Sequence, residues 1–401
     1  MPPEVALKYT FAHTGDFEMK ATTFFGLEDV LQKELLQLGA KDLVPFKRGV
    51  SFVGDLGFLY KANLCLRTAL KIIIPIYHFK AIDNDTFYNG IKEIAWEKFI
   101  TYNDSIKIEC VVNSDNFEHS LFMSQKAKDA IVDRFRERYG KRPDVDLIHP
   151  VLRIYIHIFR DEISVNLDAS GELLYKRGYR TDTNKAPINE ILAAGLVLLS
   201  GWQPHKQLID GMAGSGTIAI EAAMIANNIP PGIFRKEFAF MRWKNYDSAL
   251  FDLITESAVN KIKENELDIV ANDIYEPTVK KMQINLKNAK LTDIIKTSTE
   301  SFFDIKTDRK NGFVILNPPY GERIEKQEIA EFYKQIGDKF KKDFAGFTCW
   351  IITSSDEGFK SIGLRPSRKI TLFNGSLECK YLKFEMYEGS KKDQYTKKET
   401  L

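Results

Sequence analysis

The chain has 401 residues, of which 44% are hydrophobic and 28% are charged, and its formal net charge at pH 7 is +2. This length predicts two or three domains, and the composition is typical of a soluble globular protein. We expect neither membrane insertion nor secretion, because no apolar run reaches the length of a membrane span and no signal-peptide pattern opens the chain. The four cysteines form no CxxC pair, which argues against a zinc site or disulfide framework and predicts a reducing cytoplasmic location.

The N-terminal half predicts two small α+β domains. Residues 1–18 read as a poorly ordered leader, and residues 19–79 contain the helical pattern LEDVLQKELLQLGA between short strands. Residues 80–168 combine the alternating strand SIKIECVVN, a long helix over about His119–Tyr139, and a hairpin in VLRIYIHIFRDEISVNLD. The polar, basic stretch that follows predicts a linker over 169–187.

After the linker, strands alternate with helices, beginning with KQLIDGMAGSGT and ending with TCWIITS. This alternation predicts an α/β domain over 188–390, with a parallel sheet covered by helices on both faces. Asn374-Gly375 between two apolar runs predicts a C-terminal antiparallel hairpin. Residues 391–401 read as a frayed tail.

A glycine-rich loop, LIDGMAGSGT, lies between a predicted strand and a helix, where glycine allows close approach of a ligand to the backbone. A nucleotide-binding P-loop is excluded because no lysine precedes Thr217. A dinucleotide fold is weakly possible, but no strand ends in an acid about 20 residues further on.

S-adenosylmethionine fits this loop better. Asp210 ends the first strand and can accept hydrogen bonds from the ligand's ammonium group, above the glycines 211, 214 and 216. Asp273 ends the next strand, where a carboxylate can accept from both hydroxyls of a ribose. The alternative is a purely structural glycine turn, with Asp273 as a helix N-cap.

The sequence GFVILNPPYGER raises a different question, because an apolar strand ends in Asn317-Pro318-Pro319-Tyr320. An amine attached to an aromatic base is a poor nucleophile, and two acceptors at its hydrogens would localise the nitrogen lone pair. The side-chain oxygen of Asn317 and the carbonyl of Pro318 can be those acceptors, since proline offers no competing N–H and fixes the backbone. Tyr320 offers a face on which the base stacks. The chemistry requires no metal, and we predict a site for transfer to an exocyclic amine; the alternative is a double-proline strand end with a packing tyrosine.

Three segments carry a resemblance to a known family: NPPYGER, GMAGSGTIAIEAAMIA, and LYKRGYR with APINEILAAGLVLLSGW. The sequence resembles the bacterial THUMP-domain methyltransferases of the large-subunit (23S) ribosomal RNA guanine-N2 family, which has also carried the name N6-adenine-specific DNA methylase. The resemblance implies a ferredoxin-like domain, a THUMP domain that binds RNA, and a Rossmann-like class I methyltransferase domain. It also implies that no second methyltransferase reaction is expected, because a single such domain is present.

The resemblance further assigns residues to the cofactor. It implies that Asp210 to Thr217 cradle the methionine part, that Asp273 binds the ribose, and that Glu300 contacts the adenine where the family usually has aspartate. A helix that starts at Pro187 to Glu190 would lie over the cofactor. The family commonly has proline and cysteine where this chain has Gly211 and Ala213, and neither change removes a needed polar group. The predicted cofactor residues are Asp210, Gly211, Met212, Ala213, Gly214, Gly216, Thr217, Asp273, Ile274, Glu300, Pro187 and Glu190.

Basic residues beside the predicted pocket are candidates for RNA contacts. The linker residues Lys176, Arg177 and Arg180 are favoured, with Lys126 on the long helix and Arg323 beyond the Asn-Pro-Pro-Tyr motif. The sequence thus predicts an S-adenosylmethionine-dependent enzyme that methylates guanine N2 in 23S ribosomal RNA. Three alternatives stay open: a transfer-RNA guanine-N2 enzyme, an adenine-N6 enzyme acting on DNA or RNA, and a non-catalytic RNA-binding factor.

Overall fold

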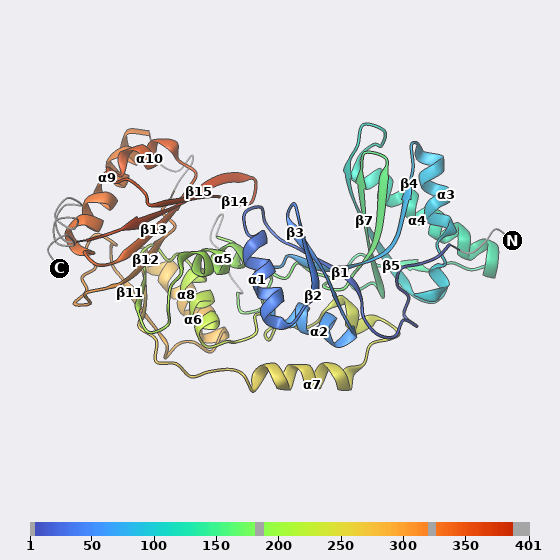
Figure 1. Cartoon of the computed structure of the whole chain (residues 1–401), viewed down its shortest axis with the longest axis horizontal. Helices are drawn as coiled ribbons and strands as arrows, with labels where there is room; N and C mark the ends of the chain where they lie inside the picture. Colours follow the sequence, from blue (N-terminus) through green and yellow to red (C-terminus); the bar gives the residue numbers. More distant parts are fainter. Residues whose placement is uncertain (1–4, 181–187, 320–325, 388–401) are drawn as a thin grey trace. The chain divides into compact units, whose positions relative to one another are not determined.

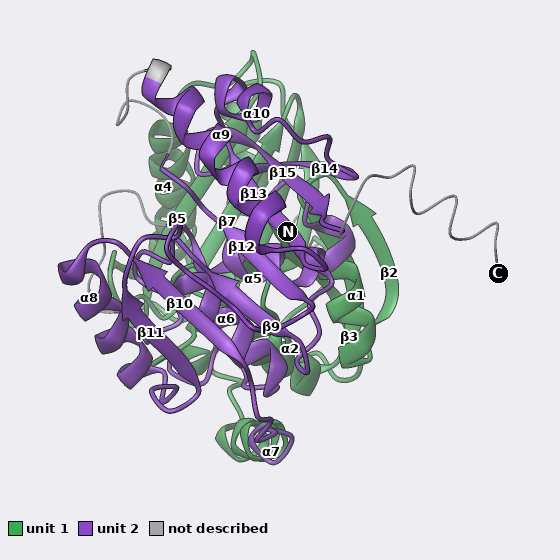
Figure 2. Cartoon of the chain, turned by 90° about the vertical axis from the view of Figure 1, so that its left-hand side faces the viewer, with its two compact units in different colours: residues 1–23, 31–176, 235–258 green, residues 24–30, 177–234, 259–401 purple. Residues whose placement is uncertain are grey.

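The computed structural model describes residues 5–180, 188–319 and 326–387. The chain forms two compact units, which Figure 2 distinguishes by colour. The first unit comprises residues 1–23, 31–176 and 235–258, and the second comprises residues 24–30, 177–234 and 259–401. Each unit is built around its own sheet.

In the described part of the first unit, eight strands form one sheet (Figure 1). All neighbouring strands are antiparallel except for β5, which runs parallel to β6 and β7. In spatial order the strands are β2 (Lys41–Phe46), β3 (Gly49–Gly54), β1 (Phe17–Thr22), β4 (Lys71–Lys80), β8 (Glu162–Asp168), β7 (Leu152–Phe159), β5 (Ser105–Asn113) and β6 (Asp144–Val145). The helical elements between residues 28 and 139 are α1 (Glu28–Leu38), α2 (Leu56–Cys65), α3 (Asn84–Glu93), the 3-10 turn η1 (Trp96–Lys98) and α4 (Ser120–Tyr139).

The sheet joins the two predicted N-terminal domains, because β4 pairs with β8 from Ile73↔Asp168 to Lys80↔Glu162. The predicted hairpin is confirmed as β7 and β8, and its alternation is visible in the burial of Leu152, Ile154, Ile156 and Ile158. The long predicted helix is confirmed as α4, which ends at Gly140 in the left-handed conformation (φ 66°).

The division of the structure into units departs from two of the predicted boundaries. The predicted leader, from residue 5 onward, belongs to the fold: Tyr9 is 2% exposed, and its ring centroid lies 4.5 Å from that of Phe17. Residues 235–258, predicted as part of a continuous domain over 188–390, pack with the first unit. They contain the 3-10 turn η2 (Ala239–Arg242) and α7 (Ser248–Val259), and Phe240 stacks on Tyr60 at 4.5 Å. The aromatic residues of FAFMRW explain this packing, because they bury a large apolar area.

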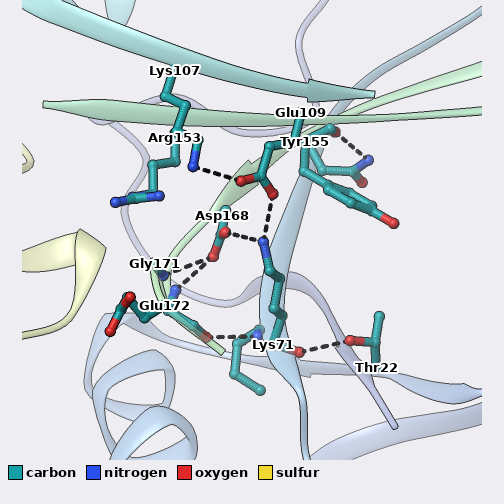
Figure 3. Close-up of polar contacts among 12 residues, drawn as sticks. Thr22, Lys71, Lys107, Glu109, Arg153, Tyr155, Asp168, Gly171 and Glu172 are labelled. Atoms are coloured by element: carbon teal, nitrogen blue, oxygen red, sulfur yellow. Dashed lines mark hydrogen bonds and ion pairs between the residues drawn. The ribbon is translucent and has the colours of Figure 1, made fainter. Parts of the chain in front are cut away.

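An ion-pair cluster, buried at Asp168 and open to solvent at Glu109, joins side chains of β4, β5 and β8 (Figure 3). Lys71 Nζ donates to Asp168 Oδ2 at 2.7 Å and to Glu109 Oε2 at 3.0 Å, and the Asp168 side chain is 3% exposed. Asp168 also accepts from the backbone N–H groups of Ser170 and Gly171. Burial alone would raise the pKa of Glu109, but the charges of Lys71 and Lys107 lower it to about 2. The cluster therefore holds the Glu109 carboxylate ionised.

We predict that Lys71→Met lowers the free energy of unfolding by about 3–5 kcal/mol, because it leaves buried Asp168 without its counter-charge. Lys107→Met is the matched control: this lysine pairs with Glu109 nearer the surface, and its loss is expected to cost about 0–1 kcal/mol. Urea unfolding of both variants checks the prediction. Equal losses in the two variants would contradict the central role of Lys71.

In the second unit, seven described strands form a sheet in which the first five are parallel (Figure 1). β15 adds antiparallel to β13, and β14 adds antiparallel to β15, as the Asn374-Gly375 hairpin predicts. In spatial order the strands are β11 (Ile295–Thr299), β10 (Ile269–Asp273), β9 (Gln207–Asp210), β12 (Gly312–Leu316), β13 (Thr348–Thr353), β15 (Leu377–Glu385) and β14 (Arg368–Asn374).

Helices cover both faces of this sheet, as predicted. Val314 and Leu316 share one apolar cluster with Ile336 and Phe340 of α9. On the other face, Tyr381 donates to the carbonyl of Leu196 in α5. The helices of the unit are α5 (Glu190–Ser200), α6 (Thr217–Ala226), α8 (Glu276–Asn288), α9 (Lys326–Asp343) and α10 (Asp356–Ser361). The predicted α/β fold is confirmed.

Candidate active site

Four polar residues lie at the carboxyl ends of four neighbouring parallel strands. Asp210 ends β9, Asp273 ends β10, Glu300 follows β11, and Asn317 follows β12. The register pairs Asp210 with Ala271 and Ile209 with Val314, so these strand ends reach the same edge of the sheet. The strand order reverses direction between β9 and β12, which is where open α/β sheets bind ligands.

The carboxyl group of Asp210 is fully buried at the end of β9. Its residue is 0% exposed, and neither carboxylate oxygen makes a hydrogen bond of normal geometry to the described residues. Burial, with a smaller contribution from the charge of Asp273, raises its pKa to about 8, although the nearby amide of Ala219 opposes the shift. A buried acid left unpaired is costly, so this site calls for a ligand that donates hydrogen bonds.

The glycine loop connects β9 to α6 beside this carboxyl group. Ala213 N donates to the carbonyl of Asn272 at 2.8 Å, and Gly214 N donates to Asp273 Oδ2 at 2.9 Å. Gly214 and Gly216 have positive φ angles of 57° and 81°, in the region that favours glycine. A Cβ added to Gly214 would meet no atom within 4 Å, so the loop borders open space that a ligand can fill.

We predict that Gly216→Ala weakens both folding and ligand binding, because a Cβ there would lie 2.7 Å from Met282 Cγ in addition to the backbone strain. Gly201→Ala is the control, since its φ is 72° but a Cβ would meet nothing within 4 Å. The strain common to both is about 1–2 kcal/mol. Melting temperatures of the two variants check whether Gly216→Ala loses more than this shared amount.

Asp273 and Glu300 are held in place by neighbouring polar groups. Asp273 accepts from the backbone N–H groups of Gly214 and Tyr275, at 2.9 and 3.0 Å. Glu300 Oε1 accepts from Asn272 Nδ2 at 2.8 Å and from Ser298 Oγ at 2.5 Å. Ile274, next to Asp273, is 60% exposed and offers an apolar surface beside these acids.

The sequence analysis missed Asn272 and Ser298, although a signal was present. Ser298 and Glu300 are two residues apart at the end of one strand, so their side chains lie on the same face. Asn272 is fully buried inside β10, where an amide needs polar partners. A polar residue two positions before a strand-end acid, and a buried amide on the neighbouring strand, are the signals by which residues that orient the acid can be found.

Asn317 follows a strand whose five residues are all buried. Its Oδ1 atom is buried and has no hydrogen-bond partner among the described residues. Pro318 is buried and Pro319 is exposed. The predicted acceptor at Asn317 is therefore available to a ligand. Pro187, Tyr320 and Arg323, which the sequence analysis also selected, lie outside the described residues.

The prediction that Arg177 and Arg180 contact RNA is wrong for this structure. The Arg177 side chain is 1% exposed and pairs with Glu221, and the Arg180 side chain is 7% exposed and pairs with Glu190. Both arginines neutralise buried acids of α5 and α6, so they are not available to a polyanion. Lys176, 51% exposed and paired with Glu172, and Lys126, paired with Asp85 at 3.7 Å, stay predictions.

The described residues contain neither a helix that could span a membrane nor a cluster of metal-ligating side chains. No helix there is long and apolar enough to cross a membrane. No group of three or more histidine, cysteine, aspartate or glutamate side chains there could hold a metal ion.

The largely parallel sheet, the glycine loop after β9 and the acids on successive strand ends define the second unit as a Rossmann-like methyltransferase. Three family descriptions match the chain: an RlmL ferredoxin-like domain at residues 18–73, a THUMP domain at 81–168, and an RMKL-like methyltransferase domain at 177–383. The chain therefore belongs to the RMKL-like methyltransferase family.

Individual relatives agree with this assignment. A Synechocystis protein named "Putative RNA methyltransferase slr0064" is 35% identical over 373 residues, which are 92% of this chain and 96% of that protein. Ribosomal RNA large subunit methyltransferase K/L of a Marinomonas species is 34% identical over 388 residues, which are 94% of this chain but 54% of the relative. The chain thus spans about half the length of the K/L relatives. The solved structure of SMU.472 complexed with SAH is 30% identical, has a TM-score of 0.83, and is matched over 94% of this chain and 100% of that one.

Proposed function

We propose that the second unit binds S-adenosylmethionine as its methyl donor. The buried, unpartnered oxygens of Asp210 fit the ammonium group of that ligand, and the open space at Gly214 fits its amino-acid portion. In this proposal Asp273 accepts a hydrogen bond from a ribose hydroxyl, and Glu300 accepts one from the adenine amine. Support also comes from SMU.472, a similar protein that was solved with SAH. The bound cofactor would supply a methyl group on a positively charged sulfur.

We further propose that the methyl acceptor is the exocyclic N2 amine of a guanine in large-subunit ribosomal RNA. The observation that carries this proposal is the Oδ1 atom of Asn317, which is buried and has no hydrogen-bond partner among the described residues. Asn317 directly follows β12, the strand next to β9 and Asp210. Such an oxygen accepts one hydrogen of an amine, and the Pro318 carbonyl accepts the other. Together they localise the nitrogen lone pair, so orientation and electrostatics supply most of the rate. As the N–C bond forms and the C–S bond breaks, the extra proton on the nitrogen leaves to water.

The RNA part of the proposal is supported by the N-terminal unit and by the relatives' names. A THUMP domain matches residues 81–168, and the K/L relatives are named ribosomal RNA large subunit methyltransferases. This chain covers only about half of the length of these relatives. The ribosomal substrate is therefore proposed on the basis of the half that this chain shares with them. The same proposal places the protein in the cytoplasm, where ribosomal RNA is found.

The experiment is methyl transfer from tritiated S-adenosylmethionine to purified substrates. Unmodified large-subunit ribosomal RNA is expected to accept label, whereas transfer RNA and duplex DNA are not. Nucleoside analysis of the product should give N2-methylguanosine. Label in N6-methyladenosine would overturn the guanine assignment, and label in transfer RNA alone would overturn the ribosomal one.

A further inference from the structure

Behind the glycine loop, four charged side chains are buried together. Arg177 and Arg180 carry positive charge, Glu190 and Glu221 carry negative charge, and each side chain is at most 7% exposed. We call these four residues the buried charge cluster. Removing charges from water costs several kcal/mol per ion. Well-packed apolar residues at the same positions often stabilise a protein at least as much as buried ion pairs do. The cluster therefore needs an explanation beyond packing.

Arg180 differs from Arg177 in what it contacts. Its guanidinium donates to the carbonyl of Ile188 at 3.1 Å and lies 3.3 Å from Glu190 Oε1. Its Nη2 atom donates to Ser215 Oγ at 3.3 Å. Ser215 lies between Gly214 and Gly216, so Arg180 links the glycine loop directly to the start of α5.

The backbone that carries Arg180 is itself fixed. Arg177 pairs with Glu221 of α6, and Tyr179 OH donates to the same carboxylate at 3.1 Å. The carbonyl of Tyr179 accepts from Asn288 Nδ2 of α8 at 2.9 Å. The residues just before Arg180 are held by hydrogen bonds and an ion pair to α6 and α8. The backbone position of Arg180 beside the loop is therefore fixed.

Ser215 is restrained from both sides. While Arg180 binds its hydroxyl, Asn285 Nδ2 of α8 donates to its carbonyl at 3.1 Å. Glycine backbones lose more conformational freedom on ordering than any other residue, so a loop with Gly214 and Gly216 needs external restraints to hold one shape. The loop must hold that shape beside Asp210 if it is to receive a ligand.

From these contacts we infer that Arg180 is a positioning residue, which holds the glycine loop in its ligand-binding conformation through Ser215. Glu190 keeps the buried guanidinium neutralised and oriented toward Ser215. The inference rests on the proposed cofactor site. It predicts that loss of the Arg180–Ser215 contact raises the dissociation constant and the KM for the cofactor about 10-fold, as expected for a hydrogen bond to a charged group. At saturating cofactor, kcat is expected to change less than about twofold, because the contact involves neither of the proposed amine acceptors.

The test measures SAH binding to the purified full chain by calorimetry, with melting temperature recorded for each protein. Ser215→Ala removes the acceptor and keeps the buried charges. Arg180→Met combined with Glu190→Gln removes both members of the ion pair, so no buried charge is left alone. Arg180→Lys keeps the charge but has a different donor geometry, and should recover part of the affinity. Ser200→Ala is the matched control, because Ser200 is 5% exposed, like Ser215 at 4%, but bonds only at the end of α5.

The expected result is about 10-fold weaker SAH binding by Ser215→Ala and by the double variant, with wild-type affinity in Ser200→Ala. Wild-type affinity in Ser215→Ala overturns the inference, and this variant decides the question if the double variant does not fold. Failure of the wild-type protein itself to bind SAH overturns the proposed function instead. Steady-state kinetics with RNA are then expected to show a raised KM for the cofactor and a nearly unchanged kcat. A general loss of stability would not produce this pattern.

Discussion

Asn317→Ala is expected to lower methyl transfer by at least about 100-fold, the scale on which loss of one preorganised transition-state contact acts. Alanine removes the Oδ1 atom of Asn317, which is buried and has no hydrogen-bond partner among the described residues. The Pro318 carbonyl stays, but a single acceptor fixes the amine poorly. The strand itself should be unaffected, because its buried residues Gly312–Leu316 are unchanged. SAH affinity is therefore expected to stay within about twofold of wild type.

Single-turnover transfer with saturating RNA and cofactor measures this effect directly. Asn317→Asp is the conservative variant, because aspartate keeps an acceptor oxygen at the same position and should retain more activity than alanine. Turnover close to wild type in Asn317→Ala would remove the amine-site assignment. A matching loss of SAH affinity would instead indicate that Asn317 supports the cofactor.

Asp210→Asn has the second largest expected effect, a loss of about 10- to 100-fold in cofactor affinity. The reason is that a buried carboxylate would pair with the ligand's ammonium, whereas an amide provides no charge and one fewer acceptor. Asp268→Asn is a suitable control, because this acid lies at the amino end of β10 and binds Arg309 and Lys296. Calorimetric titration with SAH compares the three proteins. Unchanged affinity in Asp210→Asn would separate this residue from the cofactor.

The pKa of Asp210 adds a pH dependence with a definite sign. Burial raises it from 3.8 to about 8, so the free protein holds this carboxyl protonated at pH 7. Its contribution to stability is complete below the unfolded pKa of about 4 and is lost as the pH rises through about 8. The melting temperature of the ligand-free wild type should therefore fall more between pH 6 and 9 than that of Asp210→Asn. Binding of an ammonium ligand at pH 7 should release about one proton, measurable in buffers of different ionisation enthalpy.

The strand-end residues could be predicted from the sequence because they follow short apolar runs. Asp210 and Asp273 are the last residues of their strands and Asn317 directly follows one, and parallel strands bring their carboxyl ends to one edge. The fold class follows from the same alternation of strands and helices. Nothing in this inference depends on knowing a long-range contact.

The buried arginines could not be predicted in this way. Arg177 reads as a surface residue in a polar stretch, but its partner Glu221 is 44 residues away and also buried. The packing of Phe240 on Tyr60 likewise joins residues that are far apart in sequence. In each case the local sequence predicts an exposed side chain or an unbroken domain. A contact with a residue far along the chain determines instead where the side chain lies.

The shared sheet of the first unit has a consequence for dissecting this protein. The gap between the ferredoxin-like match and the THUMP match lies inside β4 (Lys71–Lys80), which pairs with β8. A cut there would divide β4, take its partner from β8 and expose sheet edges. The cut would also part Lys71 from Asp168. Either fragment alone would carry an exposed, aggregation-prone sheet edge. The ferredoxin-like and THUMP domains are therefore expected to fold as one unit.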